Sequence, residues 1–336
     1  MVGRCNVAVI GCGNVSRMHF QAYAAHPERI NLVAACDPVP EAVERARRDY
    51  GVAKGFSSIE EVLAGAEWDV AVVCTPTAVR QGAIAQLAAA GKHVFTEKPL
   101  ADSYEEARQI VETCERAGVR IAVNQNFRYH YPFEMARRII EEGRIGGVTH
   151  IAHRELVFRQ DSGWRLEQTR HALSVMGIHW FDGFRWLLGD EARTVACATR
   201  SSSAITSKGE TDAAIQLVFE RGTVVSYAQS FSAPVQEIET VVIGERGALV
   251  LTYDDLSLYM PERRGEVVER WENPLRGARK PEATFIDLDL LLTGIEQGTD
   301  PPNSGRDNLK TVALLDAAYR SAAEGRPVTL DEGVPA

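Results

Sequence analysis

The fold of this chain is decided by residues 5–16, which read Cys5-Asn6-Val7-Ala8-Val9-Ile10-Gly11-Cys12-Gly13-Asn14-Val15-Ser16. The apolar run before Gly11 is rich in β-branched residues and too short for a buried helix, so it predicts the central strand of a parallel sheet. Gly11 lets the backbone turn sharply, and Gly13 leaves room for a pyrophosphate at the N-terminus of the next helix. The stretch therefore predicts a dinucleotide cradle, in which Ser16 replaces the usual third glycine. The residues of this cradle are Gly11, Gly13, Asn14 and Val15.

A second strand over 31–36 follows a helix expected from Val15 to Ala25, and it ends at Asp37. This completes a βαβ unit, with an acid at about the 20-residue offset at which such proteins bind the ribose hydroxyls. A carboxylate there repels a 2′-phosphate, and no arginine follows directly, so the sequence favours NAD over NADP. One alternative stays open: Asp37 only caps the helix that begins at Pro40.

Composition indicates an ordinary globular protein of two domains, with 336 residues, 45% hydrophobic and 25% charged. The formal net charge of -9 argues against nucleic acid as a partner, since phosphates call for a basic surface. No apolar run reaches the roughly 20 residues that span a bilayer, and no signal peptide is recognisable. We therefore expect a cytoplasmic protein with no membrane partner.

The six cysteines are scattered, mostly in or beside apolar strands, without a CxxC pair or the spacing of Cys/His metal ligands. They predict buried reduced thiols, with neither a disulfide framework nor a metal site. These cysteines are Cys5, Cys12, Cys36, Cys74, Cys114 and Cys197.

Two further strands end in polar residues. The strand over 69–74 leads into Thr75-Pro76-Thr77, and the strand over 92–96 leads into Glu97-Lys98-Pro99. Ligands of open α/β sheets bind outside the carboxyl ends of the strands, so these residues are candidates for the cofactor site. The residues alone leave two alternatives open, a proline turn that starts a helix and a surface Lys-Pro turn.

The alternation of strands and helices stops near Asn126, after a strand over 120–124 that completes a sheet of about six strands. We therefore predict a dinucleotide-binding Rossmann domain over 1–125, with a doubly wound parallel sheet. The rest, 126–336, is predicted to be an α+β domain that binds substrate and forms oligomers.

In this second part, a long strand over 148–159 and a helix over 172–188 precede a series of strand-like runs. Hairpin signals at 220–222 and 245–247 predict a largely antiparallel sheet. The few helices available can cover only one face, so the other face is a candidate interface for a homodimer or homotetramer.

At this point the chain resembles a known family, the Gfo/Idh/MocA oxidoreductases, which includes glucose-fructose oxidoreductase and inositol dehydrogenase. The resemblance runs through nearly the whole sequence, and Glu-Lys-Pro followed well downstream by Gly-x-His-x-x-Asp is its most specific part. The matching residues are the glycine turn, Asp37, Thr75-Pro76, Glu97-Lys98-Pro99, Asn126-Phe127-Arg128, Trp164-Arg165, Gly177 to Asp182, and Ser304-Gly305-Arg306-Asp307.

The resemblance implies a sugar or polyol substrate and assigns roles to individual residues. Trp164 and Arg165 resemble positions that line the substrate side, although a solvated loop is the alternative reading of these two residues. His179 can equally be a core histidine. The implied substrate-binding residues are Lys98, Arg128, Trp164, Arg165 and His179. The implied cofactor-binding residues, beyond the glycine turn and Asp37, are Thr75, Pro76, Thr77, Arg80, Glu97, Lys98 and Asn126.

This chain departs from the family pattern at two positions. Arg80 stands where the family usually has His, and Val175 stands where it has an Asp, four residues before His179. Because that carboxylate is missing, we expect the proton to pass between Lys98, His179 and water, with Asp182 orienting the imidazole. The expected catalytic residues are therefore Lys98, His179 and Asp182, in a cleft between the domains.

The expected function is an NAD-dependent oxidoreductase that moves a hydride between nicotinamide and a secondary alcohol or ketone of a sugar or polyol. Two alternatives remain. The same fold and cofactor support glycoside cleavage through transient oxidation, without net change in NADH. The chain can also be a dinucleotide-binding sensor without catalysis, a reading that Val175 favours and the retained Lys98 disfavours.

Overall fold

The computed structural model describes residues 3–274 and 279–330, which divide into two compact units. The first unit consists of residues 3–126 and 279–312, and the second consists of residues 127–274 and 313–330. Each unit has its own sheet and core.

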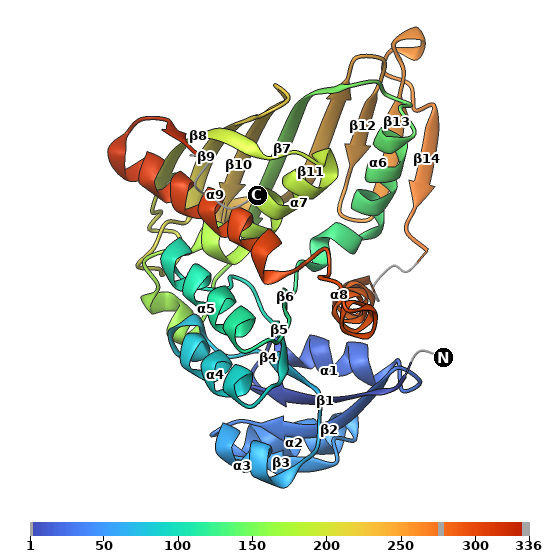
Figure 1. Cartoon of the computed structure of the whole chain (residues 1–336). Coiled ribbons are helices and arrows are strands. Elements are labelled where there is room, and N and C mark those ends of the chain that lie inside the picture. The colour runs from blue at the N-terminus through green and yellow to red at the C-terminus, as the bar shows by residue number, and fades with distance from the viewer. Residues whose placement is uncertain (1–2, 275–278, 331–336) are drawn as a thin grey trace. The chain divides into compact units, whose positions relative to one another are not determined.

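The first unit is built on a six-stranded parallel sheet with the order β3-β2-β1-β4-β5-β6 (Figure 1). This order confirms the predicted Rossmann sheet, with the strand before the glycine turn at its centre. Its strands are β1 (Cys5–Ile10), β2 (Ile30–Cys36), β3 (Lys54–Phe56), β4 (Val70–Val73), β5 (His93–Thr96) and β6 (Ile121–Val123). Its helices are α1 (Ser16–Ala24), α2 (Pro40–Tyr50), α3 (Ile59–Gly65), α4 (Thr77–Ala89), α5 (Tyr104–Arg116), α8 (Arg279–Gln297) and the first part of α9 (Gly305–Glu324).

Both faces of this sheet are covered, which explains why its strands are continuously apolar. On one face, α1, α2 and α8 pack against residues such as Val7 and Val72. On the other face, α3, α4, α5 and the start of α9 pack against residues such as Ala8 and Val73. Alternate residues of each strand thus enter two separate cores.

The division of the chain differs from the expected continuous second domain, 126–336, because residues 279–312 belong to the first unit. Leu288 and Leu291 of α8 are fully buried in the first unit's core. Buried Arg29 adds ion pairs from its Nε to Asp289 Oδ1 and from its Nη1 to Glu296 Oε1, each 2.5 Å long. The apolar spacing of α8 predicts a buried face, but not which core receives it.

The second unit is built on a nine-stranded sheet with the order β14-β13-β12-β11-β7-β10-β9-β8-β15. Only the pair β7 and β10 is parallel among these described strands, so the sheet is mixed and mostly antiparallel, as predicted. The strands are β7 (Val148–Phe158), β8 (Ala192–Arg200), β9 (Asp212–Phe219), β10 (Val224–Ser230), β11 (Ser232–Gly244), β12 (Ala248–Leu251), β13 (Asp255–Tyr259), β14 (Glu269–Glu272) and β15 (Val328–Thr329).

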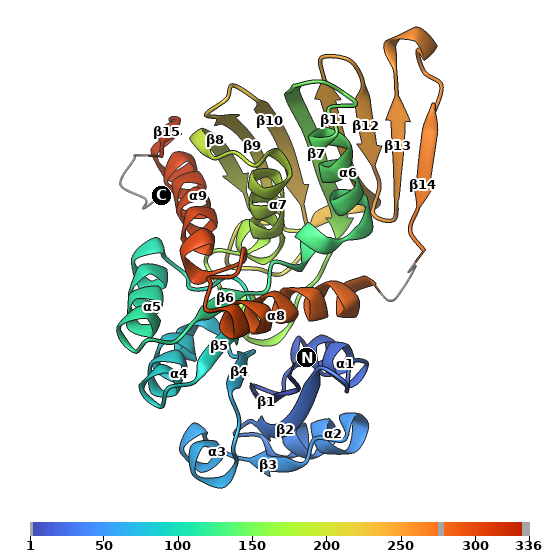
Figure 2. The ribbon, with the colours of Figure 1, turned by 45° about the vertical axis from the view of Figure 1, so that its right-hand side comes forward.

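Helices cover one face of this sheet, as Figure 2 shows for α6 (Tyr131–Glu141), α7 (Ile178–Leu188) and the end of α9. Phe133, Phe181 and Leu314 of these helices join the main core of the unit. Four short helical segments complete the unit's described secondary structure. They are η1 (Asn126–Tyr129), η2 (Gly163–Glu167), η3 (Leu173–Gly177), which is π-helical, and η4 (Pro261–Arg263).

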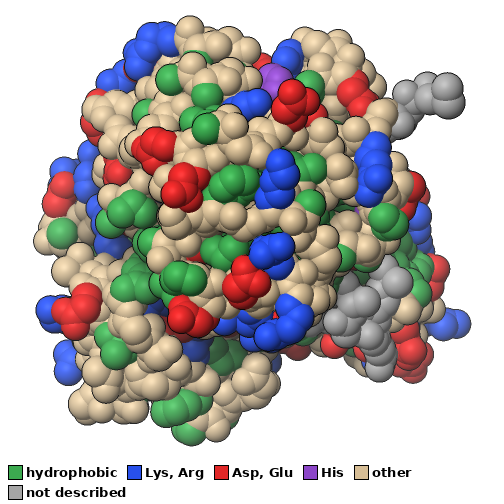
Figure 3. Space-filling model, turned by 90° about the horizontal axis from the view of Figure 1, so that it is seen from below, with side chains coloured by type: hydrophobic (Ala, Val, Ile, Leu, Met, Phe, Trp, Pro, Cys, Tyr) green, Lys and Arg blue, Asp and Glu red, His purple; other side chains and the backbone are tan. Residues whose placement is uncertain are grey.

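The surface charges, the helices and the cysteines bear on the expectations drawn from composition. Acidic and basic side chains are interspersed on the face of the molecule drawn in Figure 3. Within residues 3–274 and 279–330, no helix is both long and apolar enough to cross a bilayer, and no group of side chains is arranged to hold a metal ion. All six cysteines lie in these ranges and are free, and burial raises the pKa of the Cys12 and Cys36 thiols to about 12.

Candidate functional site

The glycine turn after β1 has the geometry that a dinucleotide requires. Gly11 has φ +94°, and a Cβ on it would lie 2.9 Å from the carbonyl carbon of Cys74, so no larger residue fits. A Cβ on exposed Gly13 would meet no described atom within 4 Å, which leaves that side of the turn open for a ligand. Ser16, at the third glycine position, is fully buried and donates from Oγ to the Gly13 carbonyl at 2.7 Å. The serine therefore braces the turn.

The N-terminus of α1 is open for an anion. Its N-cap residue, Val15, offers no side-chain hydrogen bond, and its first turn contains no acidic residue. Free backbone N–H groups and the positive end of the helix dipole both favour a phosphate at this position. Gly13, Asn14 and Val15 thus fit the pyrophosphate of a dinucleotide.

Asp37 connects the ends of two strands. Its Oδ2 accepts from the backbone N–H of Cys12 at 2.7 Å, and its Oδ1 accepts from that of Val39 at 2.9 Å. The carboxylate is therefore held beside the glycine turn, where a ribose is bound in this fold. A cation not anticipated from the sequence also reaches this turn, because Arg45 of α2 donates from Nη2 to the Cys12 carbonyl at 3.3 Å.

Several buried polar atoms at the carboxyl edge of the sheet have no hydrogen-bond partner among the described residues. They include Thr75 Oγ1 after β4, and Asn124 Oδ1, both amide atoms of Gln125 and Asn126 Oδ1 after β6. Unsatisfied buried polar atoms cost free energy, so a group of them indicates a ligand that bonds to them. An amide-bearing ring such as nicotinamide supplies both donors and acceptors. Thr77 differs, since its hydroxyl donates to Asp102 at 2.8 Å.

Lys98 follows β5 beside a buried charged network. Glu97 Oε1 lies 2.7 Å from His19 Nε2 and accepts from Asn124 Nδ2 at 2.7 Å, and Tyr23 Oη is 2.8 Å from His19 Nδ1. Burial alone raises the pKa of Glu97, but His19, Lys98 and Asn124 lower it to about 2. Burial alone lowers the pKa of His19, but Cys74, Tyr23 and Glu97 raise it well above 6.5. The two side chains therefore form an ion pair.

Arg80, expected to bind the cofactor, is buried, and its guanidinium donates to backbone carbonyls. Its Nη1 donates to the Glu97 carbonyl at 2.8 Å and also to the Pro99 carbonyl, while Nη2 donates to the Thr75 carbonyl at 2.5 Å. These bonds join the loops after β4 and β5. The guanidinium thus holds both sides of Lys98 in place, and a direct contact of Arg80 with a cofactor remains a prediction.

In the second unit, His179 lies at the start of α7, directly after π-helical η3. Its ring is 6% exposed and stacks on Phe127, with centroids 4.1 Å apart and planes at 11°. Val175, where the family has a carboxylate, packs in an apolar cluster with Val157 and Phe231. Since a π-helix is wider than an α-helix, η3 also changes the regular spacing expected between Val175 and His179.

Asp182, expected to orient His179, has a strong partner of another kind. Its Oδ2 accepts from Arg128 Nε and its Oδ1 from Arg128 Nη2, both at 2.6 Å, and Arg185 Nη1 lies 3.6 Å from Oδ1. All three side chains are buried. The structure thus brings Arg128 and Asp182 together, and their roles toward substrate and His179 stay predictions.

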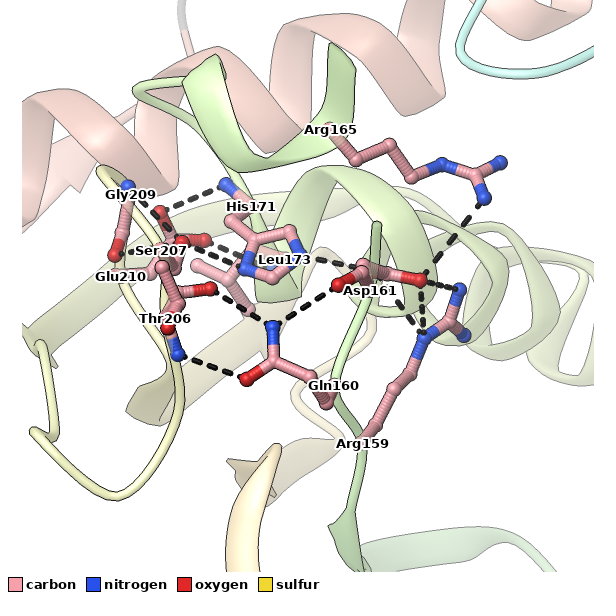
Figure 4. A network of polar contacts seen from close by, with 10 residues as sticks. All are labelled: Arg159, Gln160, Asp161, Arg165, His171, Leu173, Thr206, Ser207, Gly209 and Glu210. Atoms are coloured by element: carbon pink, nitrogen blue, oxygen red, sulfur yellow. Dashed lines mark hydrogen bonds and ion pairs between the residues drawn. The ribbon is translucent and has the colours of Figure 1, made fainter. Parts of the chain in front are cut away.

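Trp164 and Arg165 lie on η2, and Trp164 is 50% exposed. The Arg165 guanidinium is 5.5 Å from the centre of the Trp164 ring, and its Nη1 is 3.9 Å from Asp161 Oδ1. Figure 4 shows that Asp161 lies between Arg165 and Arg159, with His171 Nε2 2.9 Å from its Oδ2. Burial alone raises the pKa of Asp161, but His171, Arg159 and Arg165 lower it well below its usual range.

The same network connects two loops. His171 Nδ1 is 2.9 Å from Ser207 Oγ, and Gln160 exchanges hydrogen bonds with the backbone of Thr206 at 2.9 and 3.1 Å (Figure 4). Apart from Arg165, sequence reasoning missed this network, because Ser207 and Thr206 lie far along the chain from His171 and Gln160. It also missed His19, whose partner Glu97 is 78 residues away. His19 lies in the first turn of α1, just after the glycine turn, and this position is the only local feature of the sequence that points to it.

The comparisons with known proteins agree with this geometry. Residues 5–125 match the model of an oxidoreductase family with an NAD-binding Rossmann fold, and residues 137–330 match that family's C-terminal alpha/beta domain. The chain belongs to the Gfo/Idh/MocA oxidoreductase family and has its NAD-binding domain.

Individual relatives resemble the chain over nearly its full length. A D-apiose dehydrogenase of Paraburkholderia graminis is 31% identical, covering 98% of this chain and 90% of the relative. An inositol 2-dehydrogenase of Rhizobium meliloti is 29% identical, and the match covers 96% of this chain and 98% of the relative. Among solved structures, the WlbA dehydrogenase of Bordetella pertussis in complex with NADH and UDP-GlcNAcA has a TM-score of 0.84 at 26% identity, covering 98% of each chain.

Proposed function

We propose that this protein is an NAD-dependent oxidoreductase that transfers a hydride between nicotinamide and a secondary alcohol or ketone of a sugar or polyol. The observation that carries the proposal is the position of Lys98. This residue lies beside the buried His19–Glu97 pair, at the same sheet edge as the glycine turn. Two relatives named as dehydrogenases of a sugar and of an inositol support this substrate class.

Lys98 is proposed as the acid-base. NAD bound at the glycine turn supplies the hydride acceptor at nicotinamide C4. Oxidation of an alcohol also releases a proton, so a group with a suitable pKa must lie within about 3 Å of the reacting oxygen. An amine beside the positive charge of an oxidised nicotinamide loses its proton more readily, which suits Lys98 to this task.

The second unit is proposed to supply substrate contacts. His179 is assigned to the reacting hydroxyl or to the same proton, with Asp182 assigned to orient its imidazole. The exposed indole of Trp164 suits the C–H face of a sugar, and Arg165 suits its hydroxyls. These roles follow the family resemblance of the residues.

The cofactor preference is proposed to be NAD over NADP. Asp37 is fixed by the Cys12 and Val39 N–H groups, so its carboxylate cannot turn away from a 2′-phosphate without losing both bonds. Arg45 works against this preference, because its guanidinium reaches the same turn.

A glycoside-cleaving enzyme that oxidises its substrate only transiently is the second candidate. A sensor without catalysis ranks below both enzymes because Lys98 is retained, although the apolar packing of Val175 favours it. Screening a panel of polyols, sugars and sugar acids for NAD reduction tests all three. Net NADH formation supports the dehydrogenase, cleavage of glycosides at constant NADH supports the glycoside-cleaving enzyme, and NADH binding without any turnover supports the sensor.

We also propose that the protein forms a homodimer or homotetramer through the sheet of the second unit. The face away from α6 and α7 exposes Ala198, Ala214 and Ala228, which line a shallow hollow of about 600 Å³. Small side chains over a wide sheet let another sheet approach closely. This surface is therefore the candidate interface, and a cytoplasmic location remains an expectation.

A further inference from the structure

His19 is a buried histidine that no predicted role uses. It lies on α1 and is fully buried, with Nδ1 2.8 Å from Tyr23 Oη and Nε2 2.7 Å from Glu97 Oε1. When both ring nitrogens carry protons, each has an acceptor at hydrogen-bond distance. The site is thus built for an imidazolium.

Glu97 is held from several elements at once. Its second carboxylate oxygen accepts from the backbone N–H of Lys98 at 3.2 Å, and Asn124 Nδ2 bonds to the first. The charge of Lys98 helps to lower the pKa of Glu97, so the two charges interact. Because such an interaction is reciprocal, an uncompensated carboxylate at Glu97 would stabilise the protonated amine of Lys98.

We propose that His19 is a positioning residue for Lys98: its imidazolium cancels the Glu97 carboxylate, so that the carboxylate anchors the Lys98 backbone without trapping the Lys98 amine in its charged form. The inference rests on the proposed function, since it assigns His19 to the acid-base step of Lys98.

The other charged and titratable groups around Glu97 do not replace His19. Arg80 from α4 also interacts electrostatically with the charge of Glu97, but its guanidinium donates hydrogen bonds to the Glu97, Thr75 and Pro99 carbonyls. Tyr23 on α1 and Cys74 after β4 face His19. His19 is a cation at hydrogen-bond distance from the Glu97 carboxylate, with its Nε2 2.7 Å from Glu97 Oε1.

The test measures the titration of Lys98 directly, without substrate or cofactor. The protein is pulse-labelled with acetic anhydride at a series of pH values, and the fraction of acetylated Lys98 is read by mass spectrometry, which yields its apparent pKa. His19→Gln leaves the carboxylate unbalanced, so we expect that apparent pKa to rise by about one unit or more. The matched control is His26→Gln, which removes a histidine that stacks on Phe285 elsewhere in the first unit and should leave the titration unchanged.

Two further variants keep the test decisive if His19→Gln does not fold. In Glu97→Gln, the buried imidazole loses the carboxylate that holds its proton and becomes neutral, so the pair again has no net charge and Lys98 should titrate as in the wild type. The double variant His19→Gln/Glu97→Gln should do the same. An unchanged Lys98 titration in folded His19→Gln, or a fall of about one unit in Glu97→Gln, would overturn the proposal.

The pH profile of turnover then separates this inference from the proposed function. If the wild type oxidises a sugar or polyol, the limb of the profile that reports Lys98 should move to higher pH in His19→Gln by the shift seen in labelling. A wild type that oxidises nothing defeats the proposed function, but leaves the labelling result standing. If the wild type turns over but His19→Gln does not shift the titration of Lys98, only the inference about His19 is refuted.

Discussion

Arg128 and Asp182 form a two-point ion pair inside the second unit, with Nε to Oδ2 and Nη2 to Oδ1 both at 2.6 Å. The side chains are 3% and 1% exposed. Arg128 lies on η1 at the start of the unit, and Asp182 lies on α7. The pair therefore fixes α7, the helix that carries His179, to the segment that carries Phe127.

Breaking this pair should destabilise the second unit strongly. Asp182→Ala leaves a buried guanidinium without its main partner, and we expect the free energy of unfolding to fall by about 3–5 kcal/mol. Urea unfolding followed by tryptophan fluorescence measures it, because Trp164, Trp180, Trp186 and Trp271 lie in this unit.

The control for that experiment is Glu141→Ala, which breaks the exposed Arg137–Glu141 pair on α6. This variant should lower the free energy of unfolding by at most about 1 kcal/mol. Similar costs for the two variants would show that the Arg128–Asp182 pair contributes no more than a surface contact.

His153 of β7 should make the second unit sensitive to acid. Burial lowers its pKa from 6.5 to about 3, while its Nδ1 lies 2.8 Å from Thr240 Oγ1. Between these values the unfolded chain binds a proton that the folded chain does not, so stability falls as the pH falls, by about 1.4 kcal/mol per unit.

His153→Gln removes this titration while keeping a polar side chain. Between pH 6.5 and pH 5, the wild type should lose about 1.6 kcal/mol more stability than the variant, in the same fluorescence experiment. Identical losses in both proteins would mean that His153 is protonated in the folded state.

Asp37 should decide between the two dinucleotides. NADH is expected to bind at least about tenfold more tightly than NADPH, which corresponds to about 1.4 kcal/mol. Asp37→Ala should narrow that difference, and Arg45→Ala should widen it, because the Arg45 guanidinium donates to the Cys12 carbonyl in this turn. Calorimetric titrations that give equal affinities for the wild type would refute the assignment.

The open face of the second sheet should be a subunit interface. We expect a homodimer or homotetramer by light scattering at micromolar concentration, with more than about 1,000 Å² buried at each interface. Ala214→Arg places a charge on that face and should shift the protein towards monomers. A monomeric wild type at micromolar concentration would contradict this assignment.

Sequence reasoning predicted the first sheet well, because each feature there is local. Buried parallel strands are continuous apolar runs, and Gly11 and Asp37 mark their ends. The same logic found Glu97 and Lys98 at the end of β5. For α8, the spacing of its leucines indicates that one side is buried, but it does not indicate that this side joins the core of the first unit.

Sequence reasoning could not predict pairs of residues that are far apart in the chain. His19 and Glu97 are 78 residues apart, and Arg128 and Asp182 are 54 residues apart, so no periodicity links them. Helical spacing suggested that Asp182 orients His179, which stays a prediction, but it did not reveal that both carboxylate oxygens of Asp182 accept from Arg128. The π-helical turn of η3 was also invisible, since its apolar residues fit an α-helix equally well.

The central claim is that Lys98 moves the proton in an NAD-dependent oxidation of a sugar or polyol, and the turnover of Lys98→Ala tests it most directly. On the best substrate found in the panel, NADH formation should fall by at least about a hundredfold, while the Kd for NADH changes little, because the glycine turn and Asp37 are intact. His179→Ala should lose less turnover and raise KM. Near wild-type turnover of Lys98→Ala on that substrate would contradict the account.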